Sequence, residues 1–403
     1  MSQYELLAPA GDLERLHTAL HFGADAVYAG GPRLQLRANS VGFTMDQLAE
    51  GAEMLHAAGK KLYVTVNAFA RNDEADAAGN YARELMGLGV DGVIVADLGV
   101  IAAIREAAPD LPVHVSTQAN CTNARAARLY HQLGCRRVVL AREMNLNEIR
   151  RLREETPDDL ELEAFVHGAM CMAYSGRCMM SAYLTGRSAN RGDCTQSCRW
   201  RYHIVEQTRP GEFFPVEETE NGTTLLSSYD MNALPFLDQL MDAGIHSFKI
   251  EGRMKSAYYV ATVVNAYRRR IDGTADIPSL LAELNCASHR PYSSGFYFDE
   301  LRRHKPDEGA YEQDCVFVGV VKQSSGCEAE VEIRNKLTVR DVPEVLSPAS
   351  IGQRVHIEAM HLPDGTSVEQ ETRAGTLVRL TTDAPLRAGD FLRLRTPVRT
   401  IMH

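Results

Sequence analysis

The stretch that decides the fold is ELLAPAGDLERLHTALHFGADAVYAG, residues 5–30. A mostly apolar run at 5–11 leads into a helical stretch at 12–23, and a second apolar run follows at 25–30. Apolar runs that do not alternate with polar residues are typical of strands buried on both faces, as in parallel sheets. This stretch therefore predicts a strand, a helix and a second, parallel strand.

The same unit recurs through the first 275 residues, and several of its helical stretches end at glycine, as helices commonly do. Eight runs predict a (β/α)8 barrel of the TIM type, regular or irregular, over residues 1–275. A doubly wound open sheet is the alternative. The runs expected to form strands are 5–11, 25–30, 61–69, 92–96, 112–117, 136–142, 161–168 and 247–252.

One insertion within residues 1–275 and two segments after them complete the 403 residues. Residues 168–230 interrupt the repeat as a cysteine-rich insertion, whose end, from 198, predicts a short antiparallel excursion. Residues 276–311 predict a helical connector. Residues 312–403 have no helical periodicity and alternate between turn signals such as LPDG and RAGD, which predicts a small all-β barrel domain.

The composition excludes several classes of protein. Hydrophobic residues make up 45% and charged residues 24%, which is ordinary for a soluble globular protein. No apolar run reaches about 18 residues, so no membrane-spanning helix is expected. The first residues lack the features of a secretory signal, which predicts a cytoplasmic protein with reduced cysteines. A net charge of -10 argues against a surface that binds nucleic acid non-specifically, although local basic stretches such as 198–203 occur.

Four of the nine cysteines crowd together as Cys171, Cys178, Cys194 and Cys198. Zinc ribbons have tighter pairs and thioredoxin-type sites have C-x-x-C, and this group has neither. Irregular spacing in a glycine-rich loop favours an iron–sulfur cluster, whose corners accept thiolates from several directions. A zinc site and thiols buried as small hydrophobic side chains are the alternatives.

Polar residues follow the expected strands. Barrel enzymes build their active sites at the carboxyl ends of strands, so these residues are candidates for the site, and their surplus of Arg and Lys predicts an anionic substrate. Each candidate also has a structural alternative to a role in the site. Asp97 would cap a helix, His167 would lie in the core, and the Arg residues would form salt bridges with neighbouring Glu residues. The candidates are Asn67, Asp97, Gln118, Asn120, Arg142, Glu143, Glu163, His167, Lys249, Glu251 and Arg253.

Several motifs resemble those of a known family. EAFVHGAMCMAYSGRCMMS (163–181) is similar to the signature of the collagenase-like, "unassigned-type" peptidases. ELLAPAG, GADAVYAG and FKIEGR resemble that family at their expected places, and the resemblance covers nearly the whole chain. Within the family, HGAMCMAYSGRC and CTQSCRWRY are most similar to the prephenate-dependent tRNA uridine hydroxylases.

The resemblance implies an iron–sulfur enzyme that adds a 5-hydroxyl group to the wobble uridine of tRNA. It implies a 4Fe-4S cluster on the four cysteines, which aerobic preparations would hold as zinc or empty thiols, and prephenate as co-substrate. The implied partners are the tRNA anticodon arm, a small anion and the iron–sulfur assembly machinery, with no membrane.

Three other functions stay open. Relatives act on a ribosomal RNA cytidine or on a quinone ring, which gives alternative substrates for a hydroxylase. The family name suggests a collagenase-like peptidase, although the sequence has neither a G-x-S-x-G nor an H-E-x-x-H motif. An iron–sulfur binding or assembly protein without catalysis is the last alternative.

Roles for single residues follow from the expected chemistry. The two carboxylates of prephenate require cationic partners, and the wobble base must leave its stack and meet aromatic or Arg side chains. The predicted catalytic residues are Glu163, His167, Arg142 and Glu251. The predicted substrate contacts are Arg253, Lys249, Asn67 and Gln118, with Arg37 and Arg177 as second choices and Arg199, Trp200 and Arg201 for RNA. A buried Trp200 is the alternative to a stacking one.

Overall fold

The computed structural model describes residues 4–36, 42–171, 173–199, 229–298 and 311–401. The predicted antiparallel excursion at 198–230 lies almost entirely outside the described residues.

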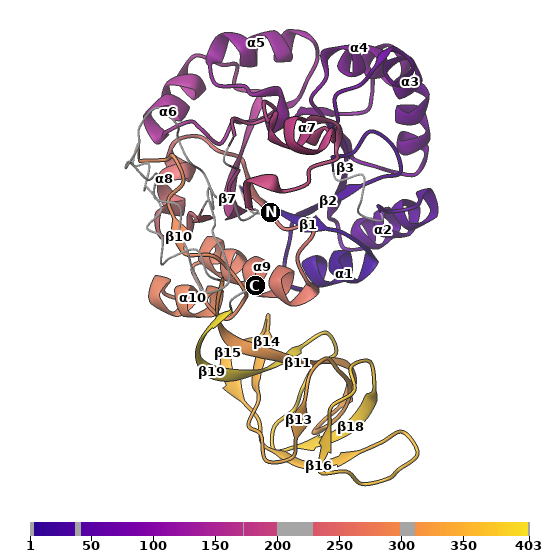
Figure 1. Cartoon of the computed structure of the whole chain (residues 1–403), viewed down its shortest axis with the longest axis vertical. Helices are drawn as coiled ribbons and strands as arrows, with labels where there is room; N and C mark the ends of the chain where they lie inside the picture. The colour runs from indigo at the N-terminus through magenta and orange to yellow at the C-terminus, as the bar shows by residue number, and fades with distance from the viewer. Residues whose placement is uncertain (1–3, 37–41, 172, 200–228, 299–310, 402–403) are drawn as a thin grey trace.

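Eight parallel strands close into a barrel (Figure 1). Seven of them pair in chain order, and the ring closes because β9 pairs in parallel with both β1 and β7. The predicted (β/α)8 barrel is therefore confirmed, and the open sheet is wrong. The barrel strands are β1 (Glu5–Ala10), β2 (Ala26–Gly30), β3 (Lys61–Val66), β4 (Gly92–Val95), β5 (Val113–Val115), β6 (Arg137–Val139), β7 (Glu161–Ala169) and β9 (Ser247–Ile250).

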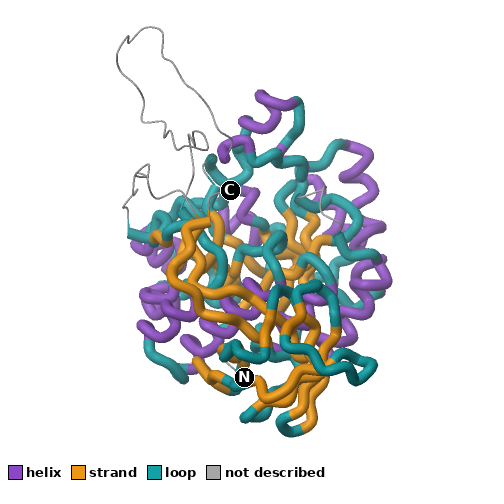
Figure 2. Tube along the Cα trace, turned by 60° about the horizontal axis from the view of Figure 1, so that its bottom comes forward, coloured by secondary structure: helices purple, strands orange, loops and turns teal. Residues whose placement is uncertain are grey.

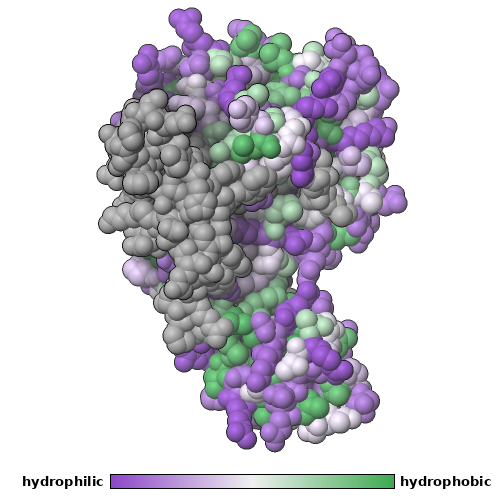
Figure 3. Space-filling model, in the orientation of Figure 1, coloured by the Kyte–Doolittle hydropathy of each residue, from purple (hydrophilic) through white to green (hydrophobic). Residues whose placement is uncertain are grey.

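Helices surround the barrel, and in the face of Figure 3 their outer rim is mostly hydrophilic. Local sequence sets their ends: the Asp12 carboxylate accepts a hydrogen bond from the Arg15 amide at the start of α1, and Gly23 follows that helix with φ +95°. In the seventh unit the cysteine-rich insertion separates β7 from its helix, α8. The helices are α1 (Leu13–His21), α2 (Met45–Ala57), α3 (Asn72–Gly87), α4 (Leu98–Ala107), α5 (Ala124–Gln132), α6 (Leu146–Glu154), α8 (Leu237–Asp242) and α9 (Ala257–Asp272).

The insertion and the connector add elements outside the ring. The short helix α7 (Met180–Thr185) lies in the insertion, and α10 (Ile277–Leu284) follows α9. Two short strands extend the sheet beyond β7: β8 (Asp230–Asn232) pairs antiparallel with β7, and β10 (Tyr292–Ser293) pairs in parallel with β8. No helix in the described part of the chain is long and apolar enough to span a bilayer.

The C-terminal domain is an antiparallel half-barrel, seen below the ring of helices in Figure 1 and coming forward in Figure 2. Its seven-stranded sheet has the order β15-β14-β19-β11-β12-β18-β16, and β13 and β17 form a small separate ladder. The all-β prediction is confirmed. The strands are β11 (Tyr311–Ser325), β12 (Glu328–Ile333), β13 (Leu337–Thr338), β14 (Glu344–Ser347), β15 (Ser350–Arg354), β16 (Ile357–His361), β17 (Gln370–Glu371), β18 (Leu377–Thr382) and β19 (Phe391–Ile401).

The two domains share a packed contact. Phe317 stacks on Tyr258 of α9 with ring centroids 5.0 Å apart, and Phe391 lies 5.7 Å from Phe22. Phe391 therefore belongs to the core cluster of the barrel domain rather than to that of the half-barrel.

Candidate active site

A cavity of about 120 Å³ lies at the carboxyl end of the barrel strands. Six residues of the predicted site line it together with Cys171, which places the first cysteine of the insertion beside the cations at the strand ends. The lining residues are Tyr28, Leu36, Thr65, Asn67, Ile94, Ser116, Thr117, Gln118, Arg142, Phe165, Ala169, Cys171, Lys249, Glu251 and Arg253.

A chain of alternating charges runs through the barrel to the floor of the cavity. The Lys249 ammonium lies 2.7 Å from Oε1 of Glu163, whose Oε2 lies 3.0 Å from Nη1 of Arg137. The same Arg137 atom contacts the Glu5 carboxylate at 2.5 Å. Glu163 is fully buried and its two oxygens contact cations, so it lies beneath the cavity and holds Lys249 in place. Glu163 was predicted to be catalytic, but it is not among the residues that line the cavity, so its position supports a positioning role instead.

Lys249 is the cation at the floor. Burial lowers the pKa of this lysine, and the Glu163 carboxylate opposes that shift. Its ammonium also lies 4.5 Å from the centre of the Tyr28 ring. The ring and the carboxylate therefore fix a positive charge under any ligand in the cavity.

Arg142 forms part of the wall. Its guanidinium lies 4.1 Å from the centre of the Phe165 ring, and Nη1 donates to the Ala169 carbonyl at 3.2 Å and approaches Sγ of Cys171 at 4.0 Å. Its Nε is buried and lacks a hydrogen-bond partner within the described part of the chain. Arg142 therefore offers a desolvated donor to a ligand.

Arg253 and Glu251 follow β9 and also line the cavity. Nη1 of Arg253 donates to Gln35 at 3.2 Å and to Thr65 at 3.0 Å, and Nη2 donates to the Leu36 carbonyl. A Cβ at Gly30 would lie 2.5 Å from Arg253 Nη1, so the absence of a side chain at this position leaves space for the guanidinium group.

Glu251 is the one carboxylate among the lining residues in the described ranges. The Tyr28 hydroxyl donates to its Oε2 at 3.3 Å. The lining thus carries three cationic side chains against one carboxylate, which suits an anionic ligand.

His167 does not line the cavity. It is 1% exposed, with ring centroids of Tyr259, Tyr267 and Tyr292 between 5.4 and 6.0 Å away. Burial lowers its pKa to about 3, which keeps it neutral. The structure thus favours the core-histidine alternative, and the position gives no support to a catalytic role.

Residues 171–198, which carry the four clustered cysteines and are called the cysteine segment below, are fixed to the mouth of the barrel. The Ser175 amide donates to the Glu143 carboxylate at 2.8 Å, so Glu143 holds this segment in place. Arg142 contacts Phe165 and the Ala169 carbonyl instead. A Cβ at Gly176 would lie 2.0 Å from the Gln118 carbonyl, so the two backbones pack directly on one another.

The four cysteines are free thiols, two exposed and two partly buried. Within the described ranges, no group of three or more His, Cys, Asp or Glu side chains is placed to hold a metal ion. The cluster on Cys171, Cys178, Cys194 and Cys198 therefore stays a prediction.

Exposed apolar side chains lie on the same segment. Tyr183 of α7 is 89% exposed, and Met179 and Tyr174 are 69% and 64% exposed. Arg177, between Tyr174 and Met179, is also exposed and does not line the cavity.

The comparisons with known proteins agree with the sequence motifs. The model of peptidase family U32 matches residues 11–306, and the model of the family's C-terminal domain matches residues 313–393. The chain belongs to peptidase family U32. The resemblance drawn from the sequence is confirmed.

Some relatives of this chain are named for RNA hydroxylation and others for proteolysis. "tRNA hydroxylation protein P" of Escherichia coli (strain K12) is 38% identical over 399 residues, which cover 86% of this chain and 87% of that protein. "23S rRNA 5-hydroxycytidine C2501 synthase" of the same organism is 40% identical over 268 residues, covering 66% of this chain and 39% of that protein. "Collagenase" of Porphyromonas gingivalis (strain ATCC BAA-308 / W83) is 32% identical over 339 residues, covering 79% and 80%.

Some predicted residues cannot be assigned to the cavity. Arg37, Trp200 and Arg201 fall outside the described residues, and Arg199 is described in its backbone only. The Asp97 carboxylate accepts hydrogen bonds from the amides of Gly99 and Val100 and so caps α4, which is the structural alternative given for this residue.

The sequence analysis did not predict several uncharged residues that line this cavity, among them Tyr28, Thr65, Ser116, Thr117 and Phe165. Several of them are inward-facing residues of the strands, so the alternation of strand side chains is the signal that could have found them.

Proposed function

We propose that this U32 protein hydroxylates RNA, with the wobble uridine of tRNA as its target and prephenate as its co-substrate. One observation carries the proposal: a small cavity with three cations lies at the barrel mouth beside Cys171. The names of two relatives, at 38% and 40% identity, support RNA hydroxylation.

The charges of the cavity support a small dicarboxylate. Arg142 and Arg253 line the cavity from the loops after β6 and β9, and Lys249 lines it from β9 itself. Guanidinium groups bind carboxylates with two parallel hydrogen bonds, and Nε of Arg142, which has no partner among the described residues, is suited to one of them. In this proposal the two Arg side chains bind the carboxylates, Lys249 adds charge from below, and Glu251 orients the reacting group.

The surface beside the mouth supports a nucleic-acid substrate. Tyr174 and Tyr183 expose their rings on the segment that also carries the cysteines. Bases that leave a single-stranded loop stack on such rings, and each stacked base contributes about 1–3 kcal/mol. The anticodon loop of tRNA is a single-stranded loop of this kind.

The peptidase alternative has less support from the site. A cysteine nucleophile requires a base within hydrogen-bond reach, usually histidine. The described lining residues include Cys171 but no histidine, and His167 lies among core tyrosines.

We also propose that Cys171, Cys178, Cys194 and Cys198 bind a 4Fe-4S cluster. All four are free thiols on one segment at the mouth, which is the right donor chemistry, although their described positions do not form a metal site. When bound, such a cluster would supply redox chemistry next to the cavity.

Nucleoside analysis tests the function. We expect tRNA from a strain that lacks the gene to lose 5-hydroxyuridine and its derivatives, and the wild-type gene to restore them. The Cys327→Ser variant, which changes an exposed cysteine of the C-terminal domain, should restore them equally.

Two other results would decide against tRNA. Loss of a hydroxylated cytidine from ribosomal RNA alone would assign the protein to the other RNA substrate. Unchanged nucleosides together with collagen cleavage by the purified protein would establish the peptidase instead.

A further inference from the structure

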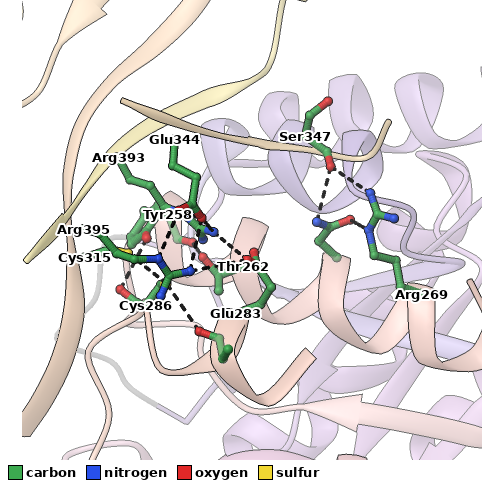
Figure 4. Close-up of polar contacts among 12 residues, drawn as sticks. Tyr258, Thr262, Arg269, Glu283, Cys286, Cys315, Glu344, Ser347, Arg393 and Arg395 are labelled. Atoms are coloured by element: carbon green, nitrogen blue, oxygen red, sulfur yellow. Dashed lines mark hydrogen bonds and ion pairs between the residues drawn. The ribbon is translucent and has the colours of Figure 1, made fainter. Parts of the chain in front are cut away.

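Cys286 and Cys315 meet at the contact between the two domains (Figure 4). Cys286 lies just after α10, Cys315 lies in β11, and their sulfur atoms are 2.8 Å apart. Both residues are fully buried, and neither belongs to the cysteine segment of the active site.

Two arginines lie close to the thiol pair. Arg393 is fully buried and donates to Glu283 at 2.6 Å and also to Glu344, and Nε of Arg395 donates to Glu344 at 3.0 Å. The pair therefore lies in a buried, charged part of the domain contact, where a thiolate can be stabilised.

The two thiols differ in acidity. The hydrogen bond with Cys286 lowers the pKa of Cys315, burial opposes that shift, and Arg393 and Arg395 add to the lowering. The same hydrogen bond and burial raise the pKa of Cys286. The contact thus holds two sulfur atoms 2.8 Å apart beside guanidinium groups that favour a thiolate, which is the arrangement of a dithiol ready for oxidation.

We propose that Cys286 and Cys315 are a redox-active dithiol that hydrogen peroxide converts to a disulfide, linking the end of α10 to the first strand of the C-terminal domain. Peroxide is the oxidant in this proposal because it is small enough to reach a buried pair. The proposal is independent of the RNA substrate and of any metal on the cysteine segment.

The reaction balances in two steps. The Cys315 thiolate attacks one peroxide oxygen, the O–O bond breaks, and the departing hydroxide takes up a proton to become water. The Cys286 sulfur then attacks the sulfenic sulfur of Cys315, an S–S bond forms, and the hydroxyl group leaves with the Cys286 proton as a second water. The two thiols lose two electrons, and peroxide is reduced to two waters.

Peptide mapping of the full chain tests the proposal. Reduced protein is freed of reductant, treated with one equivalent of hydrogen peroxide, alkylated under denaturing conditions and digested without reduction. We expect the Cys286 peptide to be linked to the Cys315 peptide, the link to be reversed by dithiothreitol, and the thermal midpoint to rise by several degrees in the oxidised form. Cys121 and Cys135, which are equally buried, serve as controls and should be recovered as alkylated thiols.

Recovery of Cys286 and Cys315 as alkylated thiols, or as separately oxidised acids, would overturn the proposal. In Cys286→Ser, the Cys315 sulfenic acid should accumulate and react with dimedone, since its partner thiol is gone. Absence of that adduct in a folded variant would show that Cys315 is not the attacking sulfur. The wild-type map remains decisive if the variant fails to fold.

Discussion

At the scale of single residues, Arg142 connects the two parts of the site. Its guanidinium packs on Phe165 and touches the Ala169 carbonyl, while Nη1 lies 4.0 Å from the Cys171 sulfur. Nε of Arg142 is buried and has no partner in the part of the chain that the structure describes, and an unsatisfied buried donor is costly, so a carboxylate ligand recovers free energy by binding it.

Replacing Arg142 tests that role. Arg142→Met keeps the apolar stem and removes the donors, so we expect kcat/KM for hydroxylation to fall by roughly 30-fold or more, which corresponds to about 2 kcal/mol or more for a lost charged hydrogen bond. Arg125→Met, an exposed change on α5, is the matched control and should leave kcat/KM unchanged. Wild-type kinetics in Arg142→Met would remove this residue from the site.

His167 makes stability depend on pH. The folded protein holds it neutral because its pKa is about 3, whereas the unfolded chain takes up a proton below about 6.5. Its contribution to stability is therefore complete above pH 6.5 and is lost as the pH falls toward 3, by up to about 1.4 kcal/mol per pH unit.

His167→Phe removes this proton linkage and keeps a ring among the tyrosines, so unfolding midpoints measured between pH 7 and pH 4 should depend less on pH than in the wild type. His356→Gln, on the surface, should keep the wild-type slope. Equal slopes for His167→Phe and wild type would contradict the neutral, buried histidine.

At the scale of elements, the cysteine segment is tied to the barrel from both sides. Glu143 accepts from Ser175 near its start, and Arg191 near its end donates to the Phe69 carbonyl at 2.8 Å and to Glu74 at 3.0 Å. These contacts fix the segment to the barrel, where Cys171 lines the cavity at the strand ends.

Iron binding should depend on these four thiols. Anaerobic reconstitution of the wild-type protein should yield about four iron atoms per chain, and Ser at Cys171, Cys178, Cys194 or Cys198 should lower that number sharply. Iron content and the visible charge-transfer absorbance measure the outcome. Cys327→Ser should bind as much iron as the wild type, and a wild-type protein that takes up no iron would refute the cluster.

At the scale of the whole molecule, a buried ionic group and stacked rings join the half-barrel to the barrel. Arg393 of β19 reaches both Glu344 of β14 and Glu283 of α10, while Phe317 stacks on Tyr258. The two domains should therefore unfold together.

Arg393→Met leaves the buried Glu283 carboxylate without a close cation and Glu344 with Arg395 alone, so we expect a loss of about 3–5 kcal/mol in the free energy of unfolding. Adding Glu283→Gln should restore part of the loss, because Glu283 is the carboxylate left without a close cation, whereas Glu344 keeps Arg395 at 3.0 Å. Denaturant unfolding measures both, with the exposed Arg379→Met as control. A loss no larger than that of the control would show that the ionic group does not hold the domains together.

The sequence by itself determined the eight strands, the family and the gathering of cations at the barrel mouth. Buried parallel strands must be apolar on both faces, so runs such as 92–96 and 247–252 could be recognised without tertiary information. Residues that follow such strands meet at one end of a barrel, which is why Arg142, Lys249 and Arg253 could be grouped in advance.

Only the tertiary structure decided which way single side chains face. Strict alternation along β7 would point Glu163, Phe165 and His167 the same way, but the register against β9 shifts between Phe165 and His167. The shift places His167 against the outer tyrosines, and Glu163 is held below the cavity by cations from β6 and β9. The meeting of Cys286 and Cys315 likewise depends on how two domains pack, and no local pattern of residues encodes that contact.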